Sequence, residues 1–311
     1  MYNSLLDTIG NTPLVKVDFG TPPAIYAKLE YFNPSGSIKD RIARFMLEEA
    51  EKNGALQPGG TIIEASSGNQ GIAVALFGAI RGYKVIITVA NKVSAEKKAA
   101  LQAYGAHLVE CPTTTSLDDP RSYHTKARNL HEQTPNSFFV NQYYNPNNCI
   151  GHYHSLGPEI WQQTNSAITH FCGGIGSGGT VVGAGQYLKE QNPEIEVLGV
   201  DSPCSYRSTN GNPKKYILEG MGVDFDTPHI KNQVIDKYLT AGDNESIEML
   251  KSLAHHHGIL VGPASGAVAC AIKKYSATLS STDTIVMIFG DSGRAYLSRN
   301  FYHKTHTPDN T

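Results

Sequence analysis

The chain has 311 residues, of which 40% are hydrophobic, and its 26 basic and 28 acidic side chains leave a formal net charge of −2. A balance this even gives no electrostatic reason to expect nucleic acid or an anionic membrane surface as a partner, so small molecules are the expected ligands. The chain is also longer than the size at which a single hydrophobic core usually stops growing, which predicts two lobes.

The start of the chain and its cysteines bear on the cellular compartment. The first residues lack the basic and apolar regions of a secretory signal, and no run of eighteen apolar residues occurs, so we expect a cytoplasmic protein. The five cysteines are dispersed and never spaced as CxxC. The sequence therefore indicates neither a disulfide framework nor a metal site, and we expect buried free thiols.

Strand-like apolar runs alternate with amphipathic helical stretches along the whole chain. In the first half we expect strands at 24–30, 61–65 and 84–90, helices at 38–52 and 71–80, and a third helix capped by Ser94. In the second half we expect strands at 170–174, 197–201 and 284–289 and helices at 181–190 and 245–256. Such alternation is typical of parallel sheets covered by helices, with ligands at the strand-to-helix junctions.

The first junction of interest is residues 33–41, where a turn-rich loop runs directly into a helix with Lys39 in its first turn. The positive end of the helix dipole disfavours a second cation, so we expect a lowered pKa for Lys39. An amine of lowered pKa can act as a nucleophile or a base at neutral pH. Taken alone, a lysine whose stem simply covers a helix start is an equally good explanation.

The second junction is residues 64–71, where an apolar strand ends and short polar side chains open a helix. Free backbone N–H groups and hydroxyls at a helix start bind carboxylate or phosphate well. A helix cap would need only one such side chain, whereas Ser66, Ser67, Asn69 and Gln70 supply four. The segment therefore predicts an anion site.

The third junction is the glycine-rich loop 173–180, again between a buried strand and a helix. Glycines let the backbone approach an anion closely, and Ser177 and Thr180 add hydroxyl donors. This combination predicts a cup for a phosphate group.

The same loop leaves a second hypothesis open, a nicotinamide-dependent oxidoreductase. Gly174, Gly176 and Gly179 satisfy GxGxxG, and Asp201 lies 22 residues beyond Gly179 at the end of the next strand. That hypothesis gives no role to Lys39 or to the second anion site. A phosphorylated aldehyde cofactor that reacts with amino acids needs all three.

Taken together, these segments resemble the fold-type II pyridoxal-phosphate (PLP) enzymes of the cysteine synthase and cystathionine β-synthase family. The matching motifs span nearly the whole chain, namely 10–15 (GNTPLV), 33–41, 66–71, 97–105 (within EKKAALQAYGA), 141–146 (NQYYNP), 176–180, 219–222 (EGMG) and 291–293 (DSG). Residues 290–293 (GDSG) also imitate the nucleophile motif of trypsin-like proteases. That rival fails because the motif ends a strand of an α/β chain.

The resemblance implies two lobes, each a mostly parallel sheet flanked by helices, as in the tryptophan synthase β fold. We place the lobe with the Schiff-base lysine and the substrate loop at residues 1–145, and allow its first thirty or so residues to pack on the other lobe. The lobe with the phosphate loop takes residues 146–302, and residues 303–311 form a tail.

Carried over residue by residue, the resemblance assigns roles to the three junctions. Lys39 would hold PLP as a Schiff base and later move the Cα proton. Asn69 would bind the ring hydroxyl, and the phosphate would be bound by Gly176, Ser177, Gly178, Gly179 and Thr180. The amino-acid substrate would be bound by Ser66, Ser67, Gly68, Gln70, Gln142 and Gly220. The implied reaction is a ping-pong β-replacement, in which the β-substituent leaves before a thiol adds.

Two departures from the family pattern matter. Relatives usually carry a serine that faces the pyridine nitrogen where this chain has Ala264. Either Ser265 reaches that nitrogen, or the nitrogen has no hydroxyl partner and the ring is a weaker electron sink. We assign the contact to Ser265. A catalytically weakened homologue that acts as a binding partner is the third hypothesis, and Ala264 is the one residue in its favour. Gln70 stands where most relatives carry threonine, which leaves the amino-acid donor open.

Several stretches look closer to cystathionine β-synthases, namely 118–123, 142–146, 151–153 and 219–222. They favour serine and homocysteine as substrates over O-acetylserine and sulfide. From the positions of the first and last motifs we expect a catalytic core alone, without a haem segment or regulatory repeats. The resemblance further implies a homodimer acting on amino-acid and thiol substrates.

Overall fold

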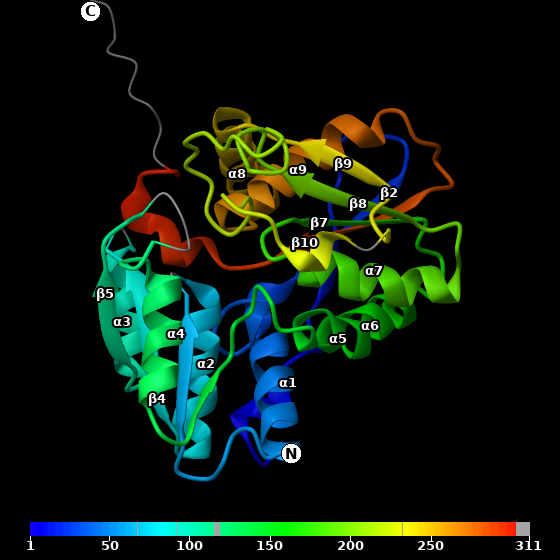
Figure 1. The fold of residues 1–311 in the computed structure, drawn as a ribbon. Coiled ribbons are helices and arrows are strands. Elements are labelled where there is room, and N and C mark those ends of the chain that lie inside the picture. Colours follow the sequence, from blue (N-terminus) through cyan, green and yellow to red (C-terminus); the bar gives the residue numbers. More distant parts are fainter. Residues whose placement is uncertain (67, 92, 115–118, 232, 303–311) are drawn as a thin grey trace, which may run out of the picture.

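The computed structural model describes residues 1–302 except 67, 92, 115–118 and 232, and contains two sheets (Figure 1). The larger has the order β1 (Leu14–Lys16), β2 (Ala24–Leu29), β10 (Thr284–Phe289), β7 (His170–Gly174), β8 (Glu196–Asp201), β9 (Lys237–Thr240). The smaller has the order β5 (His107–Cys111), β4 (Lys84–Ala90), β3 (Thr61–Ala65), β6 (Ser137–Phe139). In the described residues, β1 and β2 form the one antiparallel pair.

Helices flank both sheets, which confirms the predicted α/β class. The helices of the first half of the chain are α1 (Lys39–Lys52), α2 (Asn69–Arg81), α3 (Ala95–Ala103) and α4 (Tyr123–Gln133). Those of the second half are α5 (Asn147–His154), α6 (Leu156–Gln163), α7 (Gly179–Gln191), α8 (Asp243–His257) and α9 (Pro263–Ser276). Short 3-10 helices include η2 (Glu30–Phe32) and η4 (Gly293–Arg299). No helix in the described ranges has the length and apolar character that crossing a bilayer requires.

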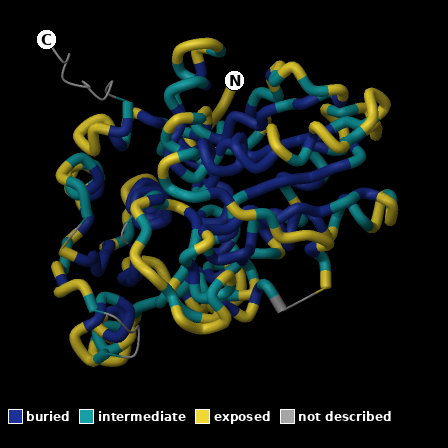
Figure 2. Tube along the Cα trace, turned by 90° about the horizontal axis from the view of Figure 1, so that it is seen from above, coloured by how far each residue is buried: buried dark blue, intermediate teal, exposed yellow. Residues whose placement is uncertain are grey.

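The larger sheet is buried on both faces, as the strand β10 illustrates. Met287 and Phe289 belong to the core cluster under α8 and α9, whereas Val286 and Ile288 belong to the cluster under α6 and α7. Because side chains of a strand alternate between faces, a strand that is apolar at every position must be covered on both sides. Figure 2 shows buried backbone through the middle of the molecule and exposed segments mainly around its periphery.

The first strands of the chain belong to the sheet of the second half. Strand β2 pairs in parallel with β10, from Ala24 opposite Thr284 to Leu29 opposite Phe289. The chain then crosses through η2 into α1 and the smaller sheet. Consequently α1 begins against the end of β10, and Ile38 N donates to Gly290 O at 2.8 Å.

Three helices begin two residues earlier than predicted, and one of them is α8, which begins at Asp243 rather than at residue 245. Helix α2 begins at Asn69 rather than at residue 71, and α7 begins at Gly179 rather than at 181. The glycines and short polar residues of both junctions suggested loop, yet they form the first helical turns. All five cysteines are free as predicted, but only Cys111, Cys172 and Cys270 are fully buried.

Candidate active site

Lys39 is the first residue of α1, and its side chain is half-buried. Burial lowers the pKa of Lys39 to about 8, and the Glu64 carboxylate partly opposes that effect. The direction is the one predicted, and burial is its largest cause. At pH 7 an amine of this pKa is neutral in about a tenth of molecules, which suits a nucleophile.

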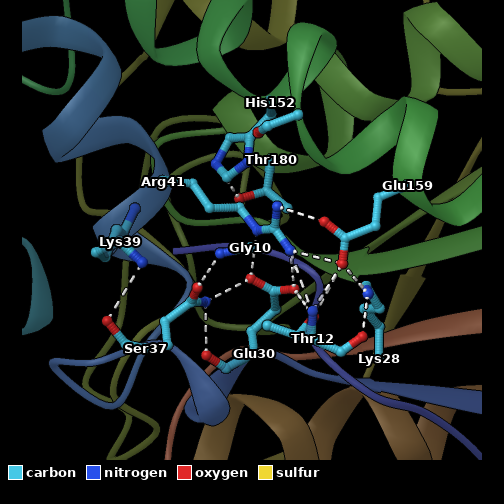
Figure 3. A network of polar contacts seen from close by, with 12 residues as sticks. Gly10, Thr12, Lys28, Glu30, Ser37, Lys39, Arg41, His152, Glu159 and Thr180 are labelled. Carbon is cyan, nitrogen blue, oxygen red and sulfur yellow. Dashed lines mark hydrogen bonds and ion pairs between the residues drawn. The ribbon is translucent and has the colours of Figure 1, made fainter. Parts of the chain in front are cut away.

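A buried ion network anchors the first turn of α1 (Figure 3). The Arg41 guanidinium donates to Glu30 at 2.7 and 2.8 Å and to Glu159 at 2.9 Å. Lys28 pairs with the same Glu159 and donates to Thr12 O at 2.6 Å. Two cations thus face two carboxylates, which is the condition under which buried ions are tolerated. The sequence analysis did not find this network, whose members come from four separate segments.

The charge of Glu30 depends on Arg41. Burial by itself would raise the pKa of Glu30, but Arg41, the Thr12 hydroxyl and Lys28 together outweigh burial and bring the pKa below its usual value. Glu30 is therefore ionised at neutral pH, and the buried carboxylate depends on the positive charge of Arg41.

The glycine loop between β7 and α7 has the form of a phosphate cup. Gly178 has a φ of +90°, which a glycine adopts without strain. A Cβ added at Gly179 would lie 2.0 Å from Asn148 Oδ1, so a side chain is excluded at the first residue of α7. The free N–H groups of this helix start therefore remain open to an anion.

Helix α5 supports both hydroxyls of this loop. Asn148 Nδ2 donates to Ser177 Oγ at 3.0 Å, and His152 Nε2 lies 3.0 Å from Thr180 Oγ1. Burial lowers the pKa of His152 well below its usual value, so the ring is neutral. These supporting residues were missed by the sequence analysis, where an Asn and a His four apart on one helix face were their only signal.

The second junction also places polar groups at a helix start. Ser66 Oγ accepts from Gly71 N at 3.0 Å and from Gly68 N at 3.3 Å, which turns the chain into α2. Gln70 is buried, and both of its amide atoms are without a hydrogen-bond partner in the described part of the structure. Since buried amides normally have partners, this side chain is available to a ligand. Ser67 lies outside the described residues.

Contacts connect the phosphate loop and its support to two predicted substrate residues, Gln142 and Gly220. The Gln142 carbonyl accepts from Asn148 Nδ2 at 2.8 Å, so the substrate and phosphate residues share one support. A Cβ added at Gly176 would lie 3.3 Å from Gly220 O, and Gly220 itself has a φ of +90°. The structure thus brings the segments of both glycines together.

Ser265, to which the ring-nitrogen contact was assigned, lies at the start of α9. Ser265 is buried in the first turn of α9, and its Oγ accepts from Gly290 N at 3.2 Å. Gly290 O in turn accepts from Ile38 N, so Gly290 connects Ser265 to the residue that precedes α1. Ala264 is directed toward Gly220, whose added Cβ would lie 3.4 Å from the Ala264 Cβ.

The residues present fit pyridoxal phosphate. They supply an amine of lowered pKa, a helix start with no side chain in the way, two supported hydroxyls and a buried unpartnered amide. The dinucleotide hypothesis fares worse, because Asp201 already accepts from Ser202 N, Ser205 Oγ and Ser208 Oγ at 2.8, 2.6 and 3.3 Å. The carboxylate that would bind a ribose is thus occupied by its own loop.

Fold and site together define a PLP-dependent enzyme of fold type II. The family model described as "Pyridoxal-phosphate dependent enzyme" matches residues 5–291, and the chain belongs to this family. Its relatives include a cystathionine beta-synthase of Apis mellifera, 39% identical over 304 residues, and a cysteine synthase of Helicobacter pylori, 38% identical over 307 residues.

These relatives differ in length. The alignments cover 95% of this chain and 60% of the Apis mellifera protein, but 97% of this chain and 99% of the Helicobacter pylori protein. The chain therefore spans about three fifths of the cystathionine β-synthase that it matches. Among solved structures, the O-acetylserine dependent cystathionine beta-synthase from Helicobacter pylori superimposes with a TM-score of 0.92 at 37% identity, covering 97% of this chain and 99% of that one. The comparisons give the dinucleotide hypothesis no support.

Proposed function

We propose that this chain catalyses a PLP-dependent β-replacement that forms a C–S bond at the β-carbon of serine or of an O-activated serine. The observation that carries the proposal is the position of Lys39, an amine with a pKa near 8 at the start of α1. His152, which contacts the phosphate-cup residue Thr180, has its pKa lowered by burial and further by the charge of Lys39. This charge effect supports a placement of the Lys39 amine near the phosphate cup, and Figure 3 draws Lys39, His152 and Thr180 in one view.

Within this proposal each junction has one task. PLP, when bound, supplies an electron sink for negative charge at the substrate Cα. Lys39 binds the cofactor and moves the Cα proton, because an amine whose pKa is close to the working pH can both accept and release a proton. Residues 176–180 hold the phosphate, Asn69 binds the ring oxygen, and Ser265 faces the ring nitrogen.

The substrate residues of the proposal are Ser66, Gly68, Gln70, Gln142 and Gly220. The N–H groups at the start of α2 and the unpartnered Gln70 amide would bind the carboxylate of the amino acid. The role proposed for Ser67 rests on the sequence alone, since that residue is outside the described ranges.

We favour serine and homocysteine as substrates, which makes the activity that of a cystathionine β-synthase. The Apis mellifera relative and the motif at 219–222 support this choice. Cysteine synthase activity, from O-acetylserine and sulfide, is the second candidate because the cysteine synthase of Helicobacter pylori matches over 99% of its length. The homodimer and the cytoplasmic location remain predictions, and light scattering tests the first.

The decisive experiment combines donors with acceptors. Purified protein loaded with PLP is incubated with L-serine, O-acetyl-L-serine or O-phospho-L-serine, each with homocysteine or sulfide, and products are quantified by mass spectrometry. Cystathionine from serine is the expected main product. Cysteine from O-acetylserine alone would instead select the second candidate. A loaded protein that forms neither product from any pair would refute β-replacement.

A further inference from the structure

Asp291 joins the two halves of the candidate site through its side chain. It follows β10 after one glycine and is buried. Its Oδ2 atom accepts a hydrogen bond from Asn69 Nδ2 at 2.7 Å and another from the Tyr296 hydroxyl at 2.6 Å. Asn69 opens α2 beside the smaller sheet, so this carboxylate connects that helix to the end of a strand in the larger sheet.

The surroundings hold the carboxylate in one position. A Cβ added at Gly262 would lie 2.1 Å from Asp291 Oδ1, so the glycine leaves room for this oxygen. Gly262 N also donates to Asp291 O at 3.1 Å, and residue 291 forms an isolated bridge with Ser37, two residues before Lys39. The side chain therefore has little freedom to rotate.

Tyr296 is held as firmly as the carboxylate that it contacts. Its ring is 1% exposed, and Lys97 Nζ lies 4.4 Å from the ring centroid. Lys97 in turn donates to Glu219 at 2.6 Å, which is a second contact between α3 and the other half of the chain. A cation over the ring and a bonded hydroxyl together fix the direction in which Tyr296 donates.

This geometry determines which end of the Asn69 amide faces Asp291. A side-chain amide has an NH2 end and a carbonyl end, and the hydrogen-bond network decides between them. Asp291 Oδ2 accepts a hydrogen bond from the Tyr296 hydroxyl and can accept another, but it cannot donate one. The NH2 end of the Asn69 amide must therefore point toward it. One N–H is then used, and the second N–H remains for another acceptor.

We propose that Asp291, together with Tyr296, is a positioning residue that fixes the Asn69 amide so that Asn69 donates a hydrogen bond to the ring oxygen of the cofactor. The proposal rests on the assignment of PLP to this site. Its consequence is chemical: an Asn69 that can only donate favours a deprotonated ring oxygen, which is an acceptor. If the Asn69 amide could turn over, its carbonyl oxygen would accept a hydrogen bond from a protonated ring oxygen equally well.

Absorbance of the PLP-loaded protein without substrate tests this proposal, because the two protonation states of the ring oxygen absorb differently. The deprotonated form absorbs in the visible and the protonated form in the near ultraviolet. The variants are Asp291→Ala, Asp291→Asn and Tyr296→Phe. The matched control is Tyr302→Phe, which removes a hydroxyl that donates to Val261 O at 2.5 Å and not to Asp291.

We expect Asp291→Ala to raise the ratio of near-ultraviolet to visible absorbance about tenfold, which is the loss of one charge-assisted hydrogen bond. Asp291→Asn has the same shape but can donate as well as accept, so we expect a smaller rise of about threefold, and Tyr296→Phe should behave similarly. Tyr302→Phe should keep the wild-type ratio. A merely structural role would leave the Asp291→Asn ratio unchanged.

The proposal is overturned if Asp291→Asn and Tyr296→Phe both keep the wild-type ratio, or if Tyr302→Phe shifts it as much as they do. These two conservative variants decide the matter even if Asp291→Ala fails to fold. A wild-type protein that shows no visible band after PLP is added would refute the cofactor assignment itself. A normal wild-type band with unchanged variants would refute only the role of Asp291.

Discussion

Replacing Arg41 by methionine tests how the first turn of α1 is held. The change keeps much of the side chain's volume but removes the cation that pairs with Glu30, whose side chain is 0% exposed. Breaking a buried pair by removing one partner costs about 3–5 kcal/mol of unfolding free energy, since the remaining charge stays buried. For a chain of this size we expect the melting temperature to fall by about 10 °C.

A second variant separates charge from packing. Adding Glu30→Gln to Arg41→Met removes the unpaired carboxylate, so the double variant should recover part of the lost stability rather than lose more. Thermal unfolding followed by circular dichroism measures all three proteins. An Arg41→Met variant within about 1 kcal/mol of wild type would refute the account, as would losses that simply add in the double variant.

The same ion network predicts that the free energy of unfolding depends on pH. Burial raises the pKa of Glu30, but Arg41, with Thr12 and Lys28, outweighs burial and the folded value lies below the ordinary 4.5. The group therefore stabilises the fold fully above pH 4.5 and loses this contribution as the pH falls through the lowered folded pKa. The gap in stability between wild type and Arg41→Met should accordingly narrow in acid.

Further predictions concern the site itself. Because burial lowers the pKa of Lys39 to about 8, the rate at which apo protein binds PLP should rise with pH and level off above pH 8, whereas an ordinary lysine would keep gaining to pH 10. Asn148→Ala should weaken PLP binding about tenfold by titration, because Ser177 loses its donor, while Asn147→Ala on the same helix should not. Gln70→Thr should change KM for the amino-acid donor and leave PLP affinity unaltered, and a changed PLP affinity would contradict its placement.

The strands were the most predictable part of the fold. The bounds of β3, β4, β7 and β10 are those expected from the sequence. Each is an apolar run that ends at glycine or at small polar residues, so the local signal and the tertiary structure agree. The starts of α2 and α7 were missed because Asn69 and Gly179 have low helix propensity, and only the packing around them makes them helical.

The long-range contacts of the site could not be predicted. Arg41 and Glu159 are 118 residues apart, and Asn69 and Asp291 are 222 residues apart. No periodic pattern links positions so distant, because their proximity follows from how the sheets and helices pack. The sequence did select candidate site residues, since glycines and hydroxyls at strand-to-helix junctions carry a local physical signature, and their roles remain predictions.

The pKa of Lys39 illustrates a correct prediction with an incomplete cause. A lysine at a helix start predicts a lowered pKa from the dipole alone, which is a modest effect. Burial is the largest cause in the structure, and burial depends on how distant segments pack around the amine. Local sequence therefore gave the direction of the shift but could not give its size.

The central claim is that Lys39 is the residue that binds PLP, and covalent trapping tests it most directly. Wild-type protein is loaded with PLP, reduced with borohydride and digested, and the modified lysine is located by peptide mass spectrometry, with Lys39→Ala as the control. The account predicts a cofactor adduct on Lys39 and none in the variant. An adduct on another lysine, or loading of Lys39→Ala to the wild-type extent, would contradict it.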